Sequence, residues 1–377
     1  MKQIDQTSTS TNKKNSNNFN LELAIVKAWQ KQAGWLWLLW PFSFLYGIIN
    51  GIRSKLFRQG ILSSYRAPVA VMVVGNITVG GSGKTPLIIE LVRYLKNKGI
   101  KVGVISRGYG GDESLMPQIV TVNSKPQEVG DEPCLIIRET GAVVAVCPNR
   151  QQAIETLLNQ HSDIQLIIAD DGLQHYKLQR DIEWVVVDSA RGFGNKQLLP
   201  TGFLREPISR LKDSTVIYHE PYDKSKTALK VDNNKLTMHL QAEALQPLIA
   251  KKLSVISTNT ETNTETNTAT NLATKSVYAI SGIGYPQRFF NTLKDLGYEV
   301  EGIAKPDHHQ FNAEDLMYLT DKPIVITSKD AVKIAPLVSN NPKLQNLSIW
   351  VLPVKAVLSD NAYHTLTKQL SSLGIVL

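Results

Sequence analysis

A glycine-rich loop that ends in Lys84 and Thr85 holds the residues best suited to chemistry. The apolar run Val69–Val74 precedes this loop and a helical pattern over Leu87–Lys98 follows it, which is the strand–loop–helix order of a nucleotide phosphate site. Glycines let successive backbone N–H groups face one anion, and the following helix adds the positive end of its dipole. The sequence therefore predicts binding of ATP or GTP. The predicted phosphate loop consists of Thr78, Val79, Gly80, Gly81, Ser82, Gly83, Lys84 and Thr85.

Two side chains of the loop have distinct expected roles. Lys84 is expected to reach the β- and γ-phosphates, and the Thr85 hydroxyl is expected to bind Mg²⁺. Thr78 occupies the position where the commonest form of such a loop has its first glycine, whereas the later glycines are retained. The loop therefore departs from the common pattern at one position only.

Acidic residues stand where a nucleotide-bound metal needs them. The buried strand expected over Ile164–Ala169 is followed by Asp170, and a carboxylate at this end of a strand beside the phosphate loop commonly holds Mg²⁺. Asp170 is therefore the first candidate for a second metal ligand. A further acidic pair, Asp131 and Glu132, lies between a glycine and a proline, which is the composition of a solvated turn.

Apolar strand patterns alternate with helical patterns through most of the chain. This alternation predicts an α/β fold with a P-loop NTPase-type, doubly wound, mostly parallel sheet. Its expected strands are Val69–Val74, Lys101–Ser106, Ala142–Val146, Ile164–Ala169 and Glu183–Asp188, with helices over Leu87–Lys98 and Arg150–Gln160. The pattern loosens after Val216–Tyr218 and resumes as strands Val277–Ser281, Glu299–Ile303, Ile324–Thr327 and Leu347–Pro353 and helices Pro286–Leu296 and Asp330–Val338. This second set predicts a smaller α/β domain, in which Gly282–Gly284 is more typical of a tight strand-to-helix turn than of a second nucleotide site.

The domain organisation follows from these patterns and from composition. Residues 1–20 are rich in Asn, Ser, Thr and Lys, and residues 257–276 repeat Thr-Glu-Thr-Asn, so both segments are predicted to be disordered. We expect a membrane-interfacial helical anchor over residues 21–66 and the P-loop core over residues 67–215. The smaller domain is expected over residues 216–377.

The segment Trp35–Ile49 contains no charged residue across its 15 positions. This run is shorter than the roughly 20 residues that a helix needs to cross a bilayer, and Pro41 is expected to kink it. Tryptophans suit the headgroup boundary of a membrane, and a basic flank suits anionic lipid. We interpret the segment as an interfacial anchor, and a buried helix packed on the domain is the alternative. The basic flank consists of Arg53, Lys55, Arg58 and Arg66.

Overall composition narrows the possible partners. The 377 residues carry a formal net charge of +8, which favours an anionic partner such as a phospholipid surface or a phosphorylated substrate. Nucleic acid is not expected, because the basic residues are spread along the chain rather than clustered in a recognition module. Cys134 and Cys147 are too few for a disulfide framework or a zinc cluster, which favours a reducing compartment.

Motifs in an ordered series resemble those of the tetraacyldisaccharide 4′-kinase family, the lipid A 4′-kinases, from about residue 35 to residue 365. The motifs are Gly75–Pro86, Ser106–Gly110, Val129–Pro133, Asp170–His175, Leu199–Pro207 and Pro306–Phe311. The family has Thr or Ser at the position of Thr78, so the departure in the phosphate loop agrees with the resemblance. The Thr/Asn-rich tail and insert are peculiar to this chain.

The resemblance implies an enzyme that transfers the γ-phosphoryl group of Mg·ATP to the 4′-hydroxyl of tetraacyldisaccharide 1-phosphate, giving lipid IVA in lipid A biosynthesis. It implies that Asp131 is the base for the sugar hydroxyl, that His308 is its partner and that Lys84 is catalytic. The metal-site residues implied are Thr85, Asp170 and Glu206, with Glu206 either a metal ligand or a carboxylate in the water shell of the metal. The residues implied to contact substrate are Asn76, Arg107, Arg150, Asp171, Gln174, His175 and Arg205. The resemblance gives no role to His309 or Lys329.

We also expect a monomer held peripherally or monotopically on the cytoplasmic face of the inner membrane. The residues alone leave two other classes open. A membrane-associated regulatory NTPase shares the P-loop and the anchor, but it has no need for Asp131 to meet His308. A soluble nucleoside-type kinase shares the chemistry and leaves the aromatic anchor unexplained. Acceptor-dependent consumption of ATP distinguishes these classes.

Overall fold

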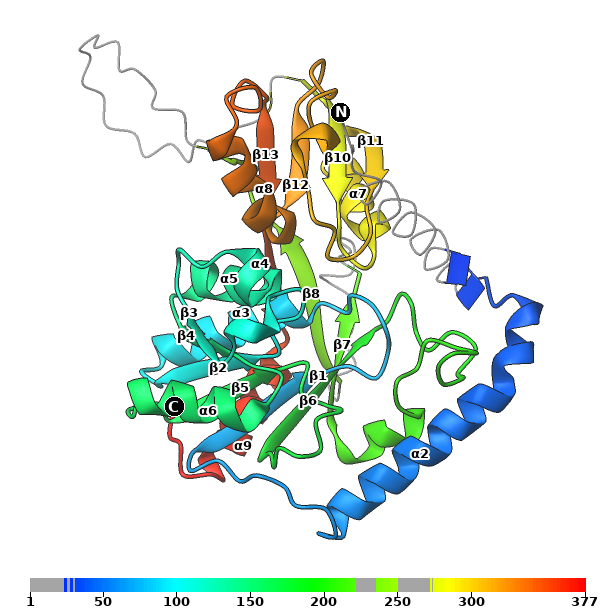
Figure 1. Cartoon of the computed structure of the whole chain (residues 1–377), viewed down its shortest axis with the longest axis vertical. Coiled ribbons are helices and arrows are strands. Elements are labelled where there is room, and N and C mark those ends of the chain that lie inside the picture. Colours follow the sequence, from blue (N-terminus) through cyan, green and yellow to red (C-terminus); the bar gives the residue numbers. More distant parts are fainter. Residues whose placement is uncertain (1–23, 26–27, 30, 222–234, 250–271, 273) are drawn as a thin grey trace, which may run out of the picture.

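The computed structural model describes residues 24–25, 28–29, 31–221, 235–249, 272 and 274–377. The predicted disordered tail, residues 1–20, lies outside the described residues, as does most of the predicted insert, residues 257–276. Figure 1 shows two α/β units stacked one on the other, with a long N-terminal helix along the side of the larger unit.

A nine-stranded, mostly parallel sheet forms the larger unit, in the order β14-β8-β7-β6-β1-β5-β2-β4-β3. Among the described strands of this sheet, only the end pairs, β14 with β8 and β3 with β4, are antiparallel. The strands are β1 (Ala70–Gly75), β2 (Val102–Ser106), β3 (Gln118–Val120), β4 (Val143–Val146), β5 (Leu166–Asp170), β6 (Ile182–Asp188), β7 (Thr215–Glu220), β8 (Leu236–Ala242) and β14 (Val354–Leu358). Its helices are α3 (Lys84–Asn97), α4 (Pro126–Val129), α5 (Asp131–Thr140), α6 (Arg150–Gln160) and α9 (Asp360–Ser371), with the short 3-10 turns η2 (Glu113–Leu115) and η3 (Ile208–Asp213). The predicted doubly wound sheet is confirmed.

Helices cover both faces of this sheet, so successive side chains of a central strand enter different cores. Met72 and Val74 of β1 pack into the cluster that contains α3, α5 and α9. Val71 and Val73 pack into the opposite cluster with α6. Strands buried on both faces have continuous apolar runs, which is why this strand was recognisable in the sequence.

A five-stranded sheet forms the smaller unit, in the order β11-β10-β12-β13-β9, with β9 antiparallel to β13. Its strands are β9 (Gln246–Pro247), β10 (Ser276–Ser281), β11 (Glu299–Ala304), β12 (Ile324–Thr327) and β13 (Ile349–Leu352). Its helices are α7 (Pro286–Asp295) and α8 (Ser328–Asn340), with the 3-10 turn η5 (Ala313–Asp315). Phe289 and Leu293 of α7 pack on one face of the sheet, and Ile334 and Val338 of α8 pack on the other.

The sheet topology differs from the expected domain boundary at residue 216. β7 pairs with β6, β8 pairs with β7 and β14 pairs with β8, so the chain leaves the larger sheet and later returns to it. Leu366 and Leu370 of α9 lie in the core of the larger unit. Sequence patterns identify strands locally, whereas sheet membership depends on partners that are distant along the chain. The smaller sheet therefore lies within residues 246–352.

The N-terminal helix is longer than the uncharged run suggested. The 3-10 turn η1 (Gly34–Leu39) continues into α2 (Trp40–Arg58), giving 25 residues that are long and apolar enough to cross a membrane. Pro41 lies in the first turn of α2, where its missing N–H removes no helical hydrogen bond. The chain changes from a 3-10 turn to an α-helix directly before Pro41. The alternative of a buried helix was wrong, because only 11% of the apolar window is buried.

Candidate active site

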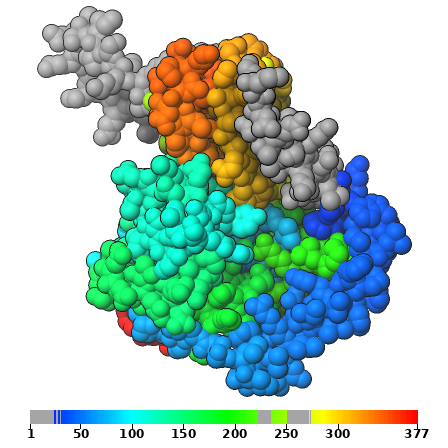
Figure 2. All heavy atoms as spheres, viewed as in Figure 1, coloured from blue at the N-terminus to red at the C-terminus, as the bar shows by residue number. Residues whose placement is uncertain are grey.

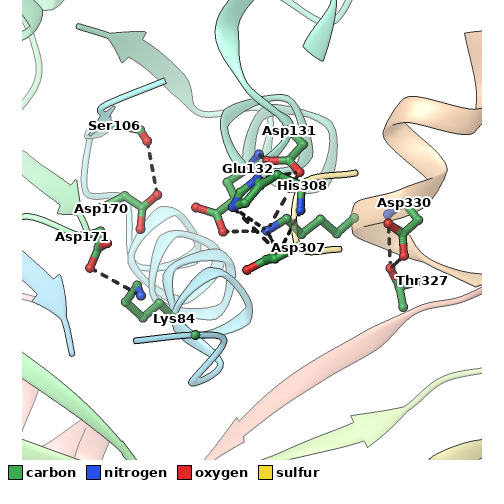
Figure 3. Close-up of polar contacts among 12 residues, drawn as sticks. Lys84, Ser106, Asp131, Glu132, Asp170, Asp171, Asp307, His308, Thr327 and Asp330 are labelled. Atoms are coloured by element: carbon green, nitrogen blue, oxygen red, sulfur yellow. Dashed lines mark hydrogen bonds and ion pairs between the residues drawn. The ribbon is translucent and has the colours of Figure 1, made fainter. Parts of the chain in front are cut away.

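The phosphate loop connects β1 to α3 and has a left-handed backbone at two glycines. Gly80 and Gly83 have φ values of 93° and 94°, which favour glycine. α3 begins at Lys84, so the unpaired N–H groups of its first turn lie at the end of the loop. Lys84 donates from Nζ to Asn76 Oδ1 at 3.1 Å and lies 3.4 Å from Asp171 Oδ1 (Figure 3). The predicted strand–loop–helix arrangement is therefore present.

Residues outside the predicted motifs hold two carbonyl groups of this loop. Arg191 donates from Nη2 to Val79 O at 3.0 Å, and His219 of β7 has Nδ1 2.8 Å from Ser82 O. The pKa of His219 is lowered to about 4, mainly by burial and secondly by the positive charge of Arg288. Its ring is therefore neutral at pH 7, and Nδ1 is the N–H donor to Ser82 O. Neither residue was predicted from the sequence, because only the pairing of distant strands brings them to the loop.

Asp170 ends β5 beside the loop and is almost fully buried. Ser106 donates from Oγ to Asp170 Oδ2 at 3.2 Å, whereas Asp170 Oδ1 has no hydrogen-bond partner among the described residues. Burial, followed by the negative charges of Glu132 and Asp171, raises the pKa of Asp170 above the usual carboxyl range. A buried carboxylate oxygen without a hydrogen-bond partner is a suitable ligand for a hard divalent cation. Asp170 and the buried Thr85 hydroxyl therefore fit a Mg²⁺ ion held with the phosphates.

Asp171 lies between two positive side chains. Arg205 donates from Nη1 to Asp171 Oδ2 at 2.9 Å, on the side away from the Lys84 contact. Burial opposes ionisation, but the positive charges of Lys84 and Arg205 lower the pKa of Asp171 to about 2. The carboxylate is therefore ionised at pH 7 and holds both cations at the loop.

The segment after β5 and the segment around Glu206 meet through side-chain hydrogen bonds. Glu206 is buried and accepts from Gln174 Nε2 at 2.7 Å and from Tyr176 Oη at 2.9 Å. Because protein donors already occupy this carboxylate, an outer position around a metal suits Glu206 better than direct coordination. Burial, followed by the positive charge of Arg150, lowers the pKa of His175 to about 4, so its ring is neutral at pH 7.

Asp131 is the first residue of α5, so the interpretation of this position as a solvated turn was wrong. Gly130 precedes it with φ of 91°, and Asp131 is only 4% exposed. His308 of the smaller unit places Nδ1 3.0 Å and 3.1 Å from the two carboxylate oxygens of Asp131 (Figure 3). The fold thus brings together the acid–base pair that the family resemblance implied.

Both members of this pair have shifted pKa values. Burial acts to raise the pKa of Asp131, but the hydrogen bond from His308 and the positive charges of Lys329 and Lys333 outweigh burial. The pKa of Asp131 is therefore below the usual range of a carboxyl group. Burial also opposes the charged form of His308, yet the hydrogen bond to Asp131 raises its pKa above the ordinary value. The carboxylate is therefore ionised at neutral pH and accepts a hydrogen bond from His308 Nδ1.

Two predicted substrate arginines have different surroundings. Arg107 is exposed and lies 3.6 Å from Glu113. Arg150 is buried, and its Nη atoms donate to the main-chain carbonyls of Cys147 at 3.0 Å and Asp170 at 3.1 Å. Arg150 therefore fixes the end of β5, and it does not present a guanidinium fork to substrate.

A glycine turn of the smaller unit lies directly against the phosphate loop. A Cβ built on Gly284 would meet Gly81 N at 2.7 Å, which is closer than real Cβ atoms approach backbone. At the start of α7, Arg288 forms an ion pair with Asp188 at the end of β6. The predicted turn between β10 and α7 is therefore a contact between the units, close to the site that both units build.

Comparisons with known proteins assign the chain to a family. A family model described as tetraacyldisaccharide-1-P 4′-kinase matches residues 35–371. The chain belongs to the tetraacyldisaccharide 4′-kinase family. Relatives named tetraacyldisaccharide 4′-kinase include one from Psychrobacter cryohalolentis, 57% identical over 94% of this chain and 98% of that protein. Another, from Actinobacillus pleuropneumoniae serotype 5b, is 45% identical over 89% of this chain and 96% of that protein.

A crystal structure agrees with this tetraacyldisaccharide 4′-kinase assignment. LpxK from Aquifex aeolicus, in complex with ATP, aligns with a TM-score of 0.65 and 25% sequence identity over 89% of this chain and 98% of that chain. The match confirms the predicted fold and the kinase class. A regulatory NTPase is not favoured, because the family model spans both units and the N-terminal helix.

Proposed function

We propose that this chain transfers the γ-phosphoryl group of Mg·ATP to the 4′-hydroxyl of tetraacyldisaccharide 1-phosphate, forming lipid IVA and ADP in lipid A biosynthesis. The observation that carries the proposal is the Asp131–His308 pair, formed across the two units on the side that faces Lys84 and Asp170 (Figure 3). A buried base with a histidine partner serves removal of a proton from an acceptor, which a nucleotide switch does not require.

In the proposed reaction the 4′-oxygen attacks the γ-phosphorus, and the bond from that phosphorus to the β–γ bridging oxygen breaks with the electron pair leaving on ADP. The hydroxyl proton moves to Asp131, which His308 orients. Lys84 and the loop N–H groups bind phosphate oxygens, so they stabilise charge where it develops. Thr85 and Asp170 are the residues that would hold Mg²⁺, and the ion supplies further charge neutralisation on the phosphates.

Substrate contacts are proposed for residues around this centre. The cluster of Lys84, Asp171 and Arg205 joins the P-loop to the segment that contacts α2. Arg107, at 60% side-chain exposure, can exchange its distant partner Glu113 for a phosphate of the lipid, which a guanidinium binds with two parallel hydrogen bonds. The remaining proposed contacts are Asn76, Gln174 and His175.

We propose that η1 and α2 hold the kinase on the cytoplasmic face of the inner membrane as a monomer. The outer side of these helices exposes many apolar side chains, among them Trp37, Leu38 and Phe42, and Figure 2 shows the segment as a band along the larger unit. On the inner side, Ser43 donates to Leu198 O at 3.0 Å. These contacts along the core favour a helix that lies in the interface, where it brings the lipid surface to the site.

The test is transfer of labelled γ-phosphate from Mg·ATP to tetraacyldisaccharide 1-phosphate in detergent micelles. We expect Asp131→Asn and Lys84→Ala each to lower kcat/KM by about 10²- to 10⁴-fold, because they remove the base and a phosphate ligand. Asp163→Asn is the matched control, since Asp163 is 63% exposed and pairs only loosely with Lys101. Hydrolysis of ATP without any phosphorylated lipid from the unsubstituted chain would refute the proposed function.

A further inference from the structure

The first turns of α8 carry two lysines from the smaller unit toward Asp131. Lys329 and Lys333 are one helical turn apart and therefore share a face of α8. Lys329 Nζ lies 3.1 Å from Glu132 Oε1 and 3.4 Å from Asp307 Oδ1. Burial opposes the charged form, but these carboxylates raise the pKa of Lys329 above its ordinary value. Lys329 is thus an ion-pair partner of the acidic groups around the base.

Lys333 has a different environment. Its side chain is 2% exposed, and its Nζ makes no hydrogen bond within the described part of the chain. The nearest carboxylate oxygens are Asp131 Oδ2 at 3.5 Å and Asp330 Oδ1 at 3.4 Å, and the ammonium lies 5.3 Å from the centre of the Phe311 ring. A buried ammonium without a hydrogen bond is costly, and an apolar side chain of similar length is often as stable at such a position. Packing alone therefore does not account for a charge here.

Asp330 links this lysine to the turn that carries His308. Asp330 Oδ2 accepts from Gly282 N at 3.1 Å and from Thr327 Oγ1 at 2.7 Å, whereas Oδ1 faces Lys333. Gly282 O in turn accepts from His308 N at 3.2 Å. The same few residues of α8 thus contact the base directly and hold the backbone of its histidine partner.

We propose that Lys333 is a positioning residue for Asp131, acting from the smaller unit together with Asp330. This inference rests on the proposed function and adds a group that fixes the base. Lys333 places a positive charge beside Oδ2 and, together with His308 and Lys329, favours the ionised form of Asp131 and its alignment with His308 before the acceptor arrives. Because the charge comes from the smaller unit, the base is fully positioned only when the two units are docked.

A change in charge at this position should be visible in the pH dependence of catalysis. The charged and titratable groups around Asp131 come from three segments. They are Glu132 and Cys134 of α5, Asp307 and His308 of the loop after β11, and Lys329, Asp330 and Lys333 of α8. Removal of one buried positive charge raises the pKa of Asp131. As pH is lowered, Asp131 is therefore protonated sooner, and the acidic limb of the pH–activity profile moves to higher pH. A residue with only a packing role would lower stability without moving that limb.

The experiment compares the full chain with Lys333→Met, Lys333→Arg and Lys343→Met, an exposed lysine of the same unit. We measure kcat and the KM for ATP across pH in micelles that contain tetraacyldisaccharide 1-phosphate. We expect Lys333→Met to lower kcat about 10- to 100-fold, with the KM for ATP changed less than about threefold and the acidic limb at higher pH. Lys333→Arg should recover most of the activity, and Lys343→Met should match the unsubstituted chain.

An unchanged pH profile and kcat in folded Lys333→Met would overturn the role of Lys333, and so would a loss of kcat without a shift of the acidic limb. If Lys333→Met does not fold, Lys333→Gln removes the same positive charge while Asp330 is kept, and the same two results decide. Absence of transfer by the unsubstituted chain would instead refute the proposed function. The two failures are therefore distinguishable.

Discussion

Replacement of Gly284 by alanine should displace the smaller unit and separate the proposed base from its partner. The added Cβ would lie 2.7 Å from Gly81 N, and ordinary contacts begin at 3.4 Å, so the turn must retreat by about 0.7 Å. The obstacle is the backbone of the phosphate loop, which cannot rotate away as a side chain does. The backbone conformation of Gly284 itself is not left-handed, so the effect comes from the contacts of the added Cβ, which include Asp307 Oδ2 at 3.0 Å as well as Gly81 N.

The displacement reaches the active site through two short links. Gly282 O holds His308 N at 3.2 Å, and His308 Nδ1 lies 3.0 Å from Asp131 Oδ1. A shift of the same size at His308 lengthens its contact with Asp131 to about 3.7 Å, beyond hydrogen-bond distance. Misplacement of a catalytic group by about 1 Å costs about 10²-fold in rate. We therefore expect kcat to fall between about 10- and 100-fold.

The assay is steady-state phosphoryl transfer to the lipid, together with the melting temperature of each variant. Gly51→Ala is the control, because a Cβ on Gly51 meets no atom within 4 Å. We expect Gly284→Ala to lower kcat while the melting transition of the larger unit is retained. An unchanged kcat would show that Gly284 and Gly81 are not in contact during turnover, and the reasoning about docking would then be refuted.

Two further predictions concern the core and the pH dependence of docking. Leu366 of α9 is fully buried in the larger unit, so Leu366→Ala should destabilise that unit by about 2–5 kcal/mol, measured by urea unfolding. Because docking raises the pKa of His308, its pairing with Asp131 stabilises the docked units fully below pH 6.5, and this stabilisation is lost as pH rises through the pKa of His308 in the docked state. Because docking lowers the pKa of Asp131, the stabilisation from Asp131 is present above pH 3.8 and is lost as pH falls through the lowered pKa. The melting temperature of the docked units should therefore be highest between these limits, and His308→Gln should remove the decline on the alkaline side.

The parts of the site that local sequence determines were predictable from the chain alone. The phosphate loop and Asp170 are examples, because a buried strand, glycines and a helix start follow one another within a short stretch. Asp131 is different. A glycine followed by acidic residues suits both a turn and a helix start, and its local sequence does not show that Asp131 is buried. Only the family resemblance connected it with His308.

Residues that act through distant pairing had no signal in the sequence. His219 reaches the phosphate loop because β7 joins the larger sheet, and the predicted boundary separated that strand from the loop. Lys333 sits among apolar residues of α8, where a single lysine gives no indication that it faces a carboxylate of another unit. Such contacts depend on tertiary packing, which periodicity within one element does not encode.

The distribution of charge between the two units gives docking a chemical consequence. The larger unit contributes the acidic groups Asp131 and Glu132, and the smaller unit contributes His308, Lys329 and Lys333 opposite them. With the units apart, Asp131 loses the partners that orient it and lower its pKa, so it is a poorly placed base even when ATP occupies the loop. With the units together, the proposed base is ionised and lies within hydrogen-bond distance of His308. The proposed set of catalytic groups is therefore complete only in the docked state, which makes phosphoryl transfer depend on contact between the two units.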